Sequence, residues 1–113
     1  MPFIDSKITV SVTPEKKEKI KAELGKAITM LNKSETYLMV GIEDNYDLWM
    51  AGAKLEKGAY VSVSLFGNAS SGAYDKMTAQ ICDLYEKELG IQGDAVYVTY
   101  HSVSDWGWNG RNF

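Results

Sequence analysis

With 113 residues and a net charge of −3, the chain is long enough to form one domain with a core, over residues 1–113, and too short to divide into two. Its 45% hydrophobic and 24% charged residues exclude the disordered and fibrous classes, and its acidic balance disfavours nucleic acid as a partner. No apolar run resembles a signal peptide or approaches the roughly 18 residues of a membrane span, so we expect a cytoplasmic protein with no membrane partner.

The first half of the chain predicts a strand, a helix and a second strand. Residues 3–10 end in β-branched side chains, which favour a strand. Thr13-Pro14-Glu15 then provides an N-cap, a proline at the first helical position and an acid in the first turn. The helix that begins there is expected to end at Asn32, and residues 37–43 are predicted as the next strand.

The second half repeats this order after a connecting loop. Residues 44–58 are predicted as loop with a short strand around Leu48-Trp49-Met50. A strand over 59–66, a helix over about 72–89 and a strand over 95–101 follow. Two β-α-β repeats predict an α/β fold of the α+β kind, in which two helices cover one face of a four-stranded mixed sheet.

The two faces of this predicted sheet differ in character. Apolar residues on one face alternate with Tyr60, Ser62, Ser64 and Phe66, and strand 95–101 sorts in the same way. We expect the apolar face to lie under the helices. The second face is too apolar to stay bare and too polar for a core, which indicates burial against other subunits.

Pro2 is the candidate catalytic residue. If the initiator Met1 is removed, Pro2 becomes a secondary amine, and burial lowers the pKa of such an amine toward the range of a useful general base. The structural alternative is a proline that merely starts an edge strand.

No metal or organic cofactor is indicated. Cys82 is the single cysteine and lies within a helical pattern, which excludes a disulfide framework and predicts a buried structural thiol. No cluster of His, Cys and carboxylate residues suggests metal ligands.

Seven pieces of sequence, in order and spacing, together resemble the macrophage migration inhibitory factor family of the tautomerase superfamily. The resemblance covers essentially the whole chain. The pieces are Pro2-Phe3-Ile4, Asn32-Lys33, Tyr37, Ser64-Leu65-Phe66-Gly67, Val96-Tyr97-Val98, Trp106-Gly107-Trp108-Asn109-Gly110 and Phe113.

The resemblance implies a homotrimer with three pockets between neighbouring subunits and a keto-enol tautomerase without a cofactor. By position, Pro2 matches the general base and acid, and Lys33 matches the lysine that meets the negative end of a phenylpyruvate-like keto acid. The main-chain amide of Phe66 lies where the family has a second contact to that end. Tyr97 matches a tyrosine supplied by the adjacent subunit, and the aromatic pocket walls match Tyr37, Trp108 and Phe113.

Departures from the family pattern place the identity of the substrate in question. Thr99 stands in place of an asparagine, Phe66 in place of an isoleucine, and Trp106 in place of a smaller residue. The Cys-x-x-Cys pair of some members falls here at Gly58 and Val61, so we expect no thiol redox activity.

Simpler roles remain open for several of these residues. Lys33 can interact with the last carbonyls of the preceding helix, and Tyr97 can serve trimer packing alone. Trp106 and Trp108 can simply cover the C-terminal ribbon, and His101, the only histidine, is interpreted as a surface or edge residue.

Two functions fit the sequence. The first is an isomerase of the phenylpyruvate or dopachrome tautomerase type. The second is a protein that imitates a host cytokine and binds a host receptor, with incidental turnover, and the resemblance also leaves open secretion without a leader.

Overall fold

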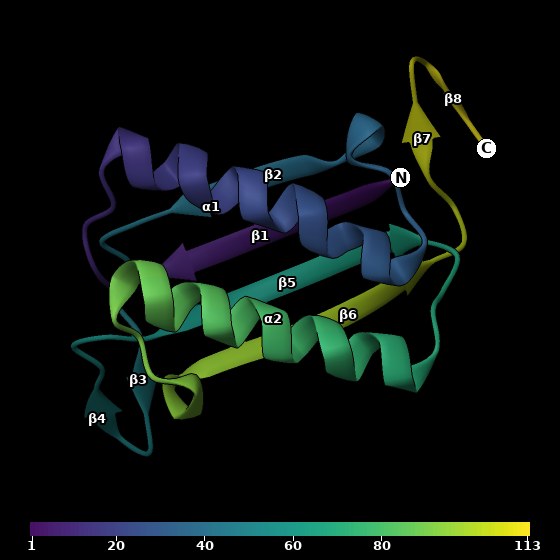
Figure 1. The fold of residues 1–113 in the computed structure, drawn as a ribbon. Helices are drawn as coiled ribbons and strands as arrows, with labels where there is room; N and C mark the ends of the chain where they lie inside the picture. Colours follow the sequence, from purple (N-terminus) through teal and green to yellow (C-terminus); the bar gives the residue numbers. More distant parts are fainter.

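Two helices lie side by side on one face of a four-stranded sheet in the computed structural model, which describes residues 1–113 (Figure 1). The strand order is β2-β1-β5-β6. Strand β1 runs parallel to β2 and antiparallel to β5, and β5 runs parallel to β6, so the sheet is mixed as predicted. The elements of the two repeats are β1 (Pro2–Ile8), α1 (Pro14–Ala27), β2 (Met39–Glu43), β5 (Ala59–Phe66), α2 (Ser71–Leu89) and β6 (Val96–Val103).

The helix boundaries follow the local signals that predicted them. The Thr13 side chain accepts a hydrogen bond from the Lys16 amide at 3.2 Å and so caps α1. The last turn of the predicted helix tightens into the 3-10 helix η1 (Ile28–Leu31) and ends at Asn32, whose φ is 58°. Gly90 ends α2 with a φ of 68°, a conformation that suits glycine.

Three predicted strands have different limits in the structure. Strand β2 begins at Met39 instead of residue 37, because Glu35–Tyr37 forms the 3-10 helix η2. The Ser34 hydroxyl accepts a hydrogen bond from the Thr36 amide at 3.1 Å, which favours this turn over an extended chain. Strand β1 spans Pro2–Ile8 instead of 3–10, and β6 continues to Val103.

Two short hairpins project from opposite ends of the sheet (Figure 1). The predicted strand around Trp49 is β3 (Trp49–Met50), and it pairs with β4 (Ala53–Lys54), which the sequence did not suggest. Near the C-terminus β7 (Gly107–Trp108) pairs with β8 (Arg111–Asn112). The Asn109-Gly110 turn of this second hairpin has φ values of 53° and 89°, the left-handed pair that a tight hairpin requires.

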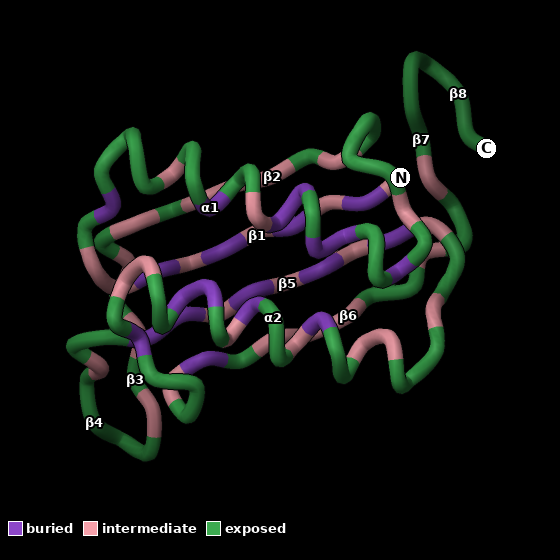
Figure 2. The backbone as a smooth tube through the Cα atoms, in the orientation of Figure 1, coloured by how far each residue is buried: buried purple, intermediate pink, exposed green.

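The core fills the space between the helices and the sheet (Figure 2). Buried residues alternate along β1 and β5, so Val61, Val63 and Leu65 face the helices while Tyr60, Ser62 and Ser64 face outward, as predicted. Within this core the hydroxyls of Ser6 and Tyr85 form a buried hydrogen bond between β1 and α2. Cys82 is half-buried, so the prediction of a buried thiol was only partly right; the partial burial raises the pKa of its thiol.

Candidate active site

A groove of about 800 Å³ opens at the end of the sheet where the inner strand β1 begins. It lies where the N-terminus, the start of β2 and the C-terminal hairpin come together (Figure 1). Eight of its twelve lining residues are hydrophobic. The aromatic and N-terminal members of this lining include Pro2, Phe3, Tyr37, Trp106 and Trp108.

Pro2 is buried at the first position of β1, opposite Leu65 of β5. The carbonyl oxygen of Met1 accepts a hydrogen bond from the Phe66 amide at 2.9 Å, which extends the β1–β5 ladder by one residue. Partial burial, and after it the charge of Lys33, lower the pKa of the Met1 amine below its usual value of 8.0. An amine at this end of β1 therefore lies in surroundings that disfavour its charged form.

Lys33 follows η1 and reaches the same end of the sheet. The left-handed Asn32 turns the chain there, and Lys33 Nζ donates a hydrogen bond to the Phe66 carbonyl at 2.8 Å. This contact differs from the alternative role predicted for Lys33, in which it interacts with the last carbonyls of its own helix. The Phe66 amide and the Lys33 ammonium are thus positioned around a single peptide segment of β5.

The three predicted wall residues, Tyr37, Trp108 and Phe113, form a continuous aromatic series with Phe66 that begins at the groove. Tyr37 meets Trp108 edge to face, with ring centroids 5.8 Å apart and an angle of 79°. Trp108 and Phe113 are nearly parallel at 6.3 Å and 9°, and Phe113 lies 5.7 Å from Phe66. These separations are in the range of ordinary aromatic contacts. Phe66 therefore packs on Phe113 and is not among the residues that line the groove.

Tyr97 lies away from the other predicted site residues. It pairs with Tyr60 of β5, whereas Pro2 pairs with Leu65, so about 17 Å of strand separates the two pairs. Tyr97 is 63% exposed, and it lines a hollow of about 240 Å³ together with Trp49 of the β3–β4 hairpin. All nine residues that line this hollow are hydrophobic.

Thr99, a departure from the family pattern, and His101 lie on the open face of the sheet. Thr99 Oγ1 lies 2.7 Å from the Tyr60 hydroxyl and 2.9 Å from His101 Nε2, so three polar side chains form one hydrogen-bonded row. His101 is exposed, in agreement with its interpretation as a surface residue. Its hydrogen-bond partner Thr99 was not anticipated.

The sequence missed several residues that line the groove. Met39, which is 68% exposed, and Val103 join it because β2 begins beside β1 and β6 ends beside the C-terminal hairpin. Trp106, by contrast, was noted in the sequence as a departure from the family pattern, and it lines the groove. No local sequence pattern marks Met39 or Val103, because their position depends on where three distant segments meet.

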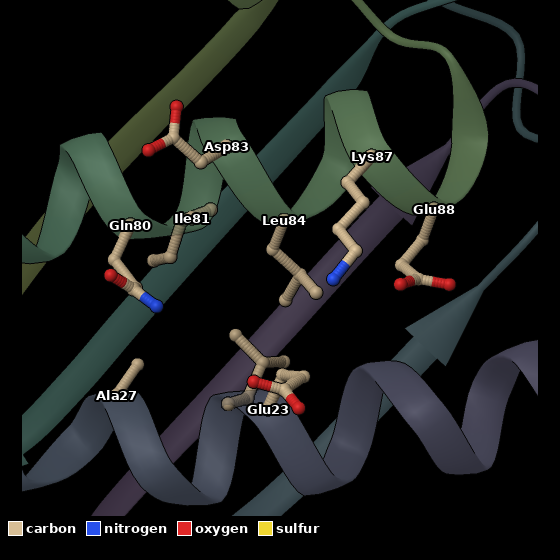
Figure 3. Close-up of a pocket in the computed structure, with 9 residues that line it drawn as sticks. Glu23, Ala27, Gln80, Ile81, Asp83, Leu84, Lys87 and Glu88 are labelled. Atoms are coloured by element: carbon tan, nitrogen blue, oxygen red, sulfur yellow. The ribbon is translucent and has the colours of Figure 1, made fainter.

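A second hollow, of about 120 Å³, lies between α1 and α2 on the other side of the molecule from the open sheet face (Figure 3). Two of its three carboxylates are paired with lysines, because Glu23 lies 3.3 Å from Lys26 and Glu88 lies 3.0 Å from Lys16. The hydrogen bond from Lys16 lowers the pKa of Glu88. These two carboxylates are therefore held in ion pairs.

The structure has neither a cluster of metal ligands nor a helix of the kind that spans a membrane. No group of three or more His, Cys, Asp or Glu side chains is placed to hold a metal ion. Neither helix combines the length and the hydropathy that crossing a membrane requires.

Comparison with known proteins gives one family over the full length. The family model described as macrophage migration inhibitory factor (MIF) matches residues 1–113. MIF2 from Leishmania major is 32% identical, with a TM-score of 0.93, and the match covers 100% of this chain and 97% of that protein. No curated protein sequence matches the chain.

Two further solved structures extend the likeness. The MIF homologue from Prochlorococcus marinus is 26% identical, with a TM-score of 0.88 and 98% of each chain covered. The MIF from Toxoplasma gondii is 24% identical, with a TM-score of 0.90 and coverage of 98% of this chain and 99% of that one, which shows a common fold.

Proposed function

We propose that this chain, which belongs to the macrophage migration inhibitory factor family and has the fold of the tautomerase superfamily, is a keto-enol tautomerase for phenylpyruvate-like aryl keto acids. It works without a cofactor, and removal of Met1 exposes Pro2 as its base. The observation that carries the proposal is the arrangement of Pro2, the Phe66 amide and Lys33 at one edge of an aromatic groove.

The contact of the Met1 carbonyl supports the role proposed for the Phe66 amide, because this carbonyl already accepts a hydrogen bond from that amide. Its oxygen receives the Phe66 N–H at 2.9 Å. Once Met1 is removed, this amide has no partner in the ladder and is available to an oxygen of the substrate. The same cleavage creates the Pro2 amine, so a base and a hydrogen-bond donor are exposed together.

The proton chemistry of the proposal needs a neutral amine on one side of the substrate. The Pro2 nitrogen takes a proton from the carbon next to the keto group, and the C–H electron pair forms the C=C bond of the enolate. The keto oxygen gains the negative charge and accepts the proton back from the protonated Pro2 nitrogen, directly or through water, which gives the enol and restores the neutral amine. Burial lowers the pKa of the Met1 amine at this end of β1, and Pro2 is itself buried, so we expect burial to favour the neutral Pro2 amine as well.

Binding of the substrate is assigned to the cation and the aromatic wall. Lys33 meets the carboxylate, and the aryl ring lies along Trp108 and Phe113. Aromatic walls lower the local dielectric and strengthen the contact between the carboxylate and Lys33.

A homotrimer is part of the proposal because one chain cannot bring Tyr97 to its own Pro2. The exposed Tyr97, the hydrophobic hollow beside it and the open sheet face all favour a neighbouring subunit as partner. We expect sedimentation to give a trimer at micromolar concentration. Mixing Pro2→Gly with Tyr97→Ala chains, each inactive alone, should restore activity if each site takes one residue from each of two subunits.

The direct test is the decay of enol-phenylpyruvate with and without Pro2→Gly. General acid–base catalysis contributes about 10²- to 10⁴-fold, so we expect a loss in kcat of that order. Ala59→Gly is the matched control, because Ala59 begins β5 as Pro2 begins β1 and lies at the other end of the sheet. A Pro2→Gly protein that retains full activity would reject the mechanism and favour the signalling or binding function.

A further inference from the structure

Arg111 is the only arginine of the chain, and it stands beside the aromatic wall of the groove. It lies directly opposite Trp108 in the β7–β8 hairpin. Residues opposite each other in an antiparallel pair share a face, and so do alternate residues of one strand. Arg111 therefore shares its face of the ribbon with Trp108 and Phe113.

These residues enclose a hollow of their own, with a volume of about 290 Å³. It is lined by Trp108, Asn109, Arg111, Asn112 and Phe113. Trp108 also lines the groove that holds Pro2, so the hollow adjoins the groove across a single indole ring. A flat ligand that extends from Pro2 along this ring reaches the hollow with its far end.

The guanidinium of Arg111 has no partner within the chain. The eight ion pairs of the protein involve lysines only. The two cation–π contacts belong to Lys7 and Lys54, far from this hairpin in the sequence. A planar guanidinium with its donors free is suited to a carboxylate, which it can bind through two parallel hydrogen bonds.

We propose that Arg111 is a specificity-determining residue that binds a second carboxylate, carried on the ring end of an aryl keto acid. The assignment rests on the proposed function for the placement of the keto-acid end at Pro2 and Lys33. The two cations then mark the two ends of the ligand, with the aromatic wall between them. The favoured substrate class is an aryl keto acid with an anionic group opposite its side chain.

The experiment is a calorimetric titration of the protein, after removal of Met1, with phenylpyruvate and with 4-carboxyphenylpyruvate. Exposed ion pairs are worth up to about 1 kcal/mol, so we expect the second ligand to bind roughly five-fold more tightly. Arg111→Gln should remove this difference and leave the affinity for phenylpyruvate unchanged. Arg111→Lys, which keeps the charge without the planar fork, should retain part of it.

Lys57→Gln is the matched control, because Lys57 is also exposed and unpaired and lies next to the start of β5, at the opposite end of the sheet. Equal affinities of wild-type protein for the two ligands, or a difference that survives Arg111→Gln, would overturn the proposal. The titration does not depend on turnover, so it can succeed where the activity assay fails. If the protein is inactive but Arg111→Gln still abolishes the affinity difference, the tautomerase function is rejected and the role of Arg111 is kept.

Discussion

The two ends of the sheet have a similar backbone architecture but carry different side chains. Each β-α-β repeat ends its helical segment at a left-handed residue, Asn32 or Gly90, and a short hairpin stands at each end of the sheet (Figure 1). The residue after the turn is Lys33 in the first repeat and the buried Ile91 in the second. The residue after the turn is therefore a cation only in the first repeat, and only at that end of the sheet does a strand begin with proline.

The strand ends show the same difference. Strand β1 begins with Pro2 beside a groove of about 800 Å³, and β5 begins with Ala59 beside a hydrophobic hollow of about 240 Å³. The repeat supplies the scaffold at both ends, while a few substitutions at one end supply the groups that we propose for proton transfer. The second end, with exposed Tyr97 and Trp49, is suited to contact with another chain.

Replacement of Lys33 should have the largest effect among binding variants. A hydrogen bond between charged groups contributes about 1.5–3 kcal/mol, so Lys33→Ala should raise KM for phenylpyruvate by roughly ten-fold or more. The same contact is made in the ground and transition states, which should leave kcat nearly unchanged. Lys57→Ala, at the other end, should change neither constant. An unchanged KM in Lys33→Ala would return Lys33 to a structural role.

Breaking the hydrogen bond between Ser6 and Tyr85 should lower the stability of the protein without changing substrate binding at the groove. Burial raises the pKa of Tyr85 to about 12, so its hydroxyl stays protonated and bonded to Ser6 at neutral pH. Tyr85→Phe leaves the Ser6 hydroxyl buried without its partner, at a cost of about 1–3 kcal/mol in the free energy of unfolding.

Denaturant unfolding at fixed protein concentration measures this change. The double variant Ser6→Ala with Tyr85→Phe removes both polar groups and should lose less stability than Tyr85→Phe alone. An equal or greater loss in the double variant would contradict the account of an orphaned hydroxyl. The KM for phenylpyruvate should be the same in all three proteins.

Substitutions in the turns of the two hairpins should have the smallest effects. Gly52 and Gly110 have φ values of 79° and 89°, and an added Cβ meets no atom within 4 Å at either position. Alanine therefore costs only the strain of the left-handed conformation, about 1–2 kcal/mol locally. Gly110→Ala should raise the KM for phenylpyruvate a few-fold because it disturbs Trp108, which lines the groove. Gly52→Ala should leave KM unchanged, and equal effects of the two variants would contradict the assignment of the groove.

Local sequence signals predicted most of the fold and part of the site. Thr13 and Gly90 marked their helix boundaries, and alternation along residues 59–66 located β5 because one face of that strand is buried. The start of β2 was misplaced because the Ser34 turn competes with the strand. The Asn109-Gly110 turn is a hairpin signal that the sequence contained and the prediction did not use.

The rest of the site depends on tertiary structure. The resemblance predicted Lys33, but its contact with the Phe66 carbonyl depends on how η1 meets the sheet. The separation of Tyr97 from Pro2 follows from the pairing register of β5, which no local pattern contains.

The Pro2 amine is the central claim, and the pH dependence of kcat/KM for phenylpyruvate tests it most directly. Burial and the charge of Lys33 lower the pKa of the Met1 amine, and we expect them to act in the same direction on the Pro2 amine, so that the neutral base persists to lower pH. We predict an ascending limb below the range of an ordinary α-amino group, about 7.7 to 8.0, in protein that begins at Pro2. Protein that retains Met1 should be inactive with an unchanged melting temperature. Equal activity and the same pH profile in the two proteins would contradict the account.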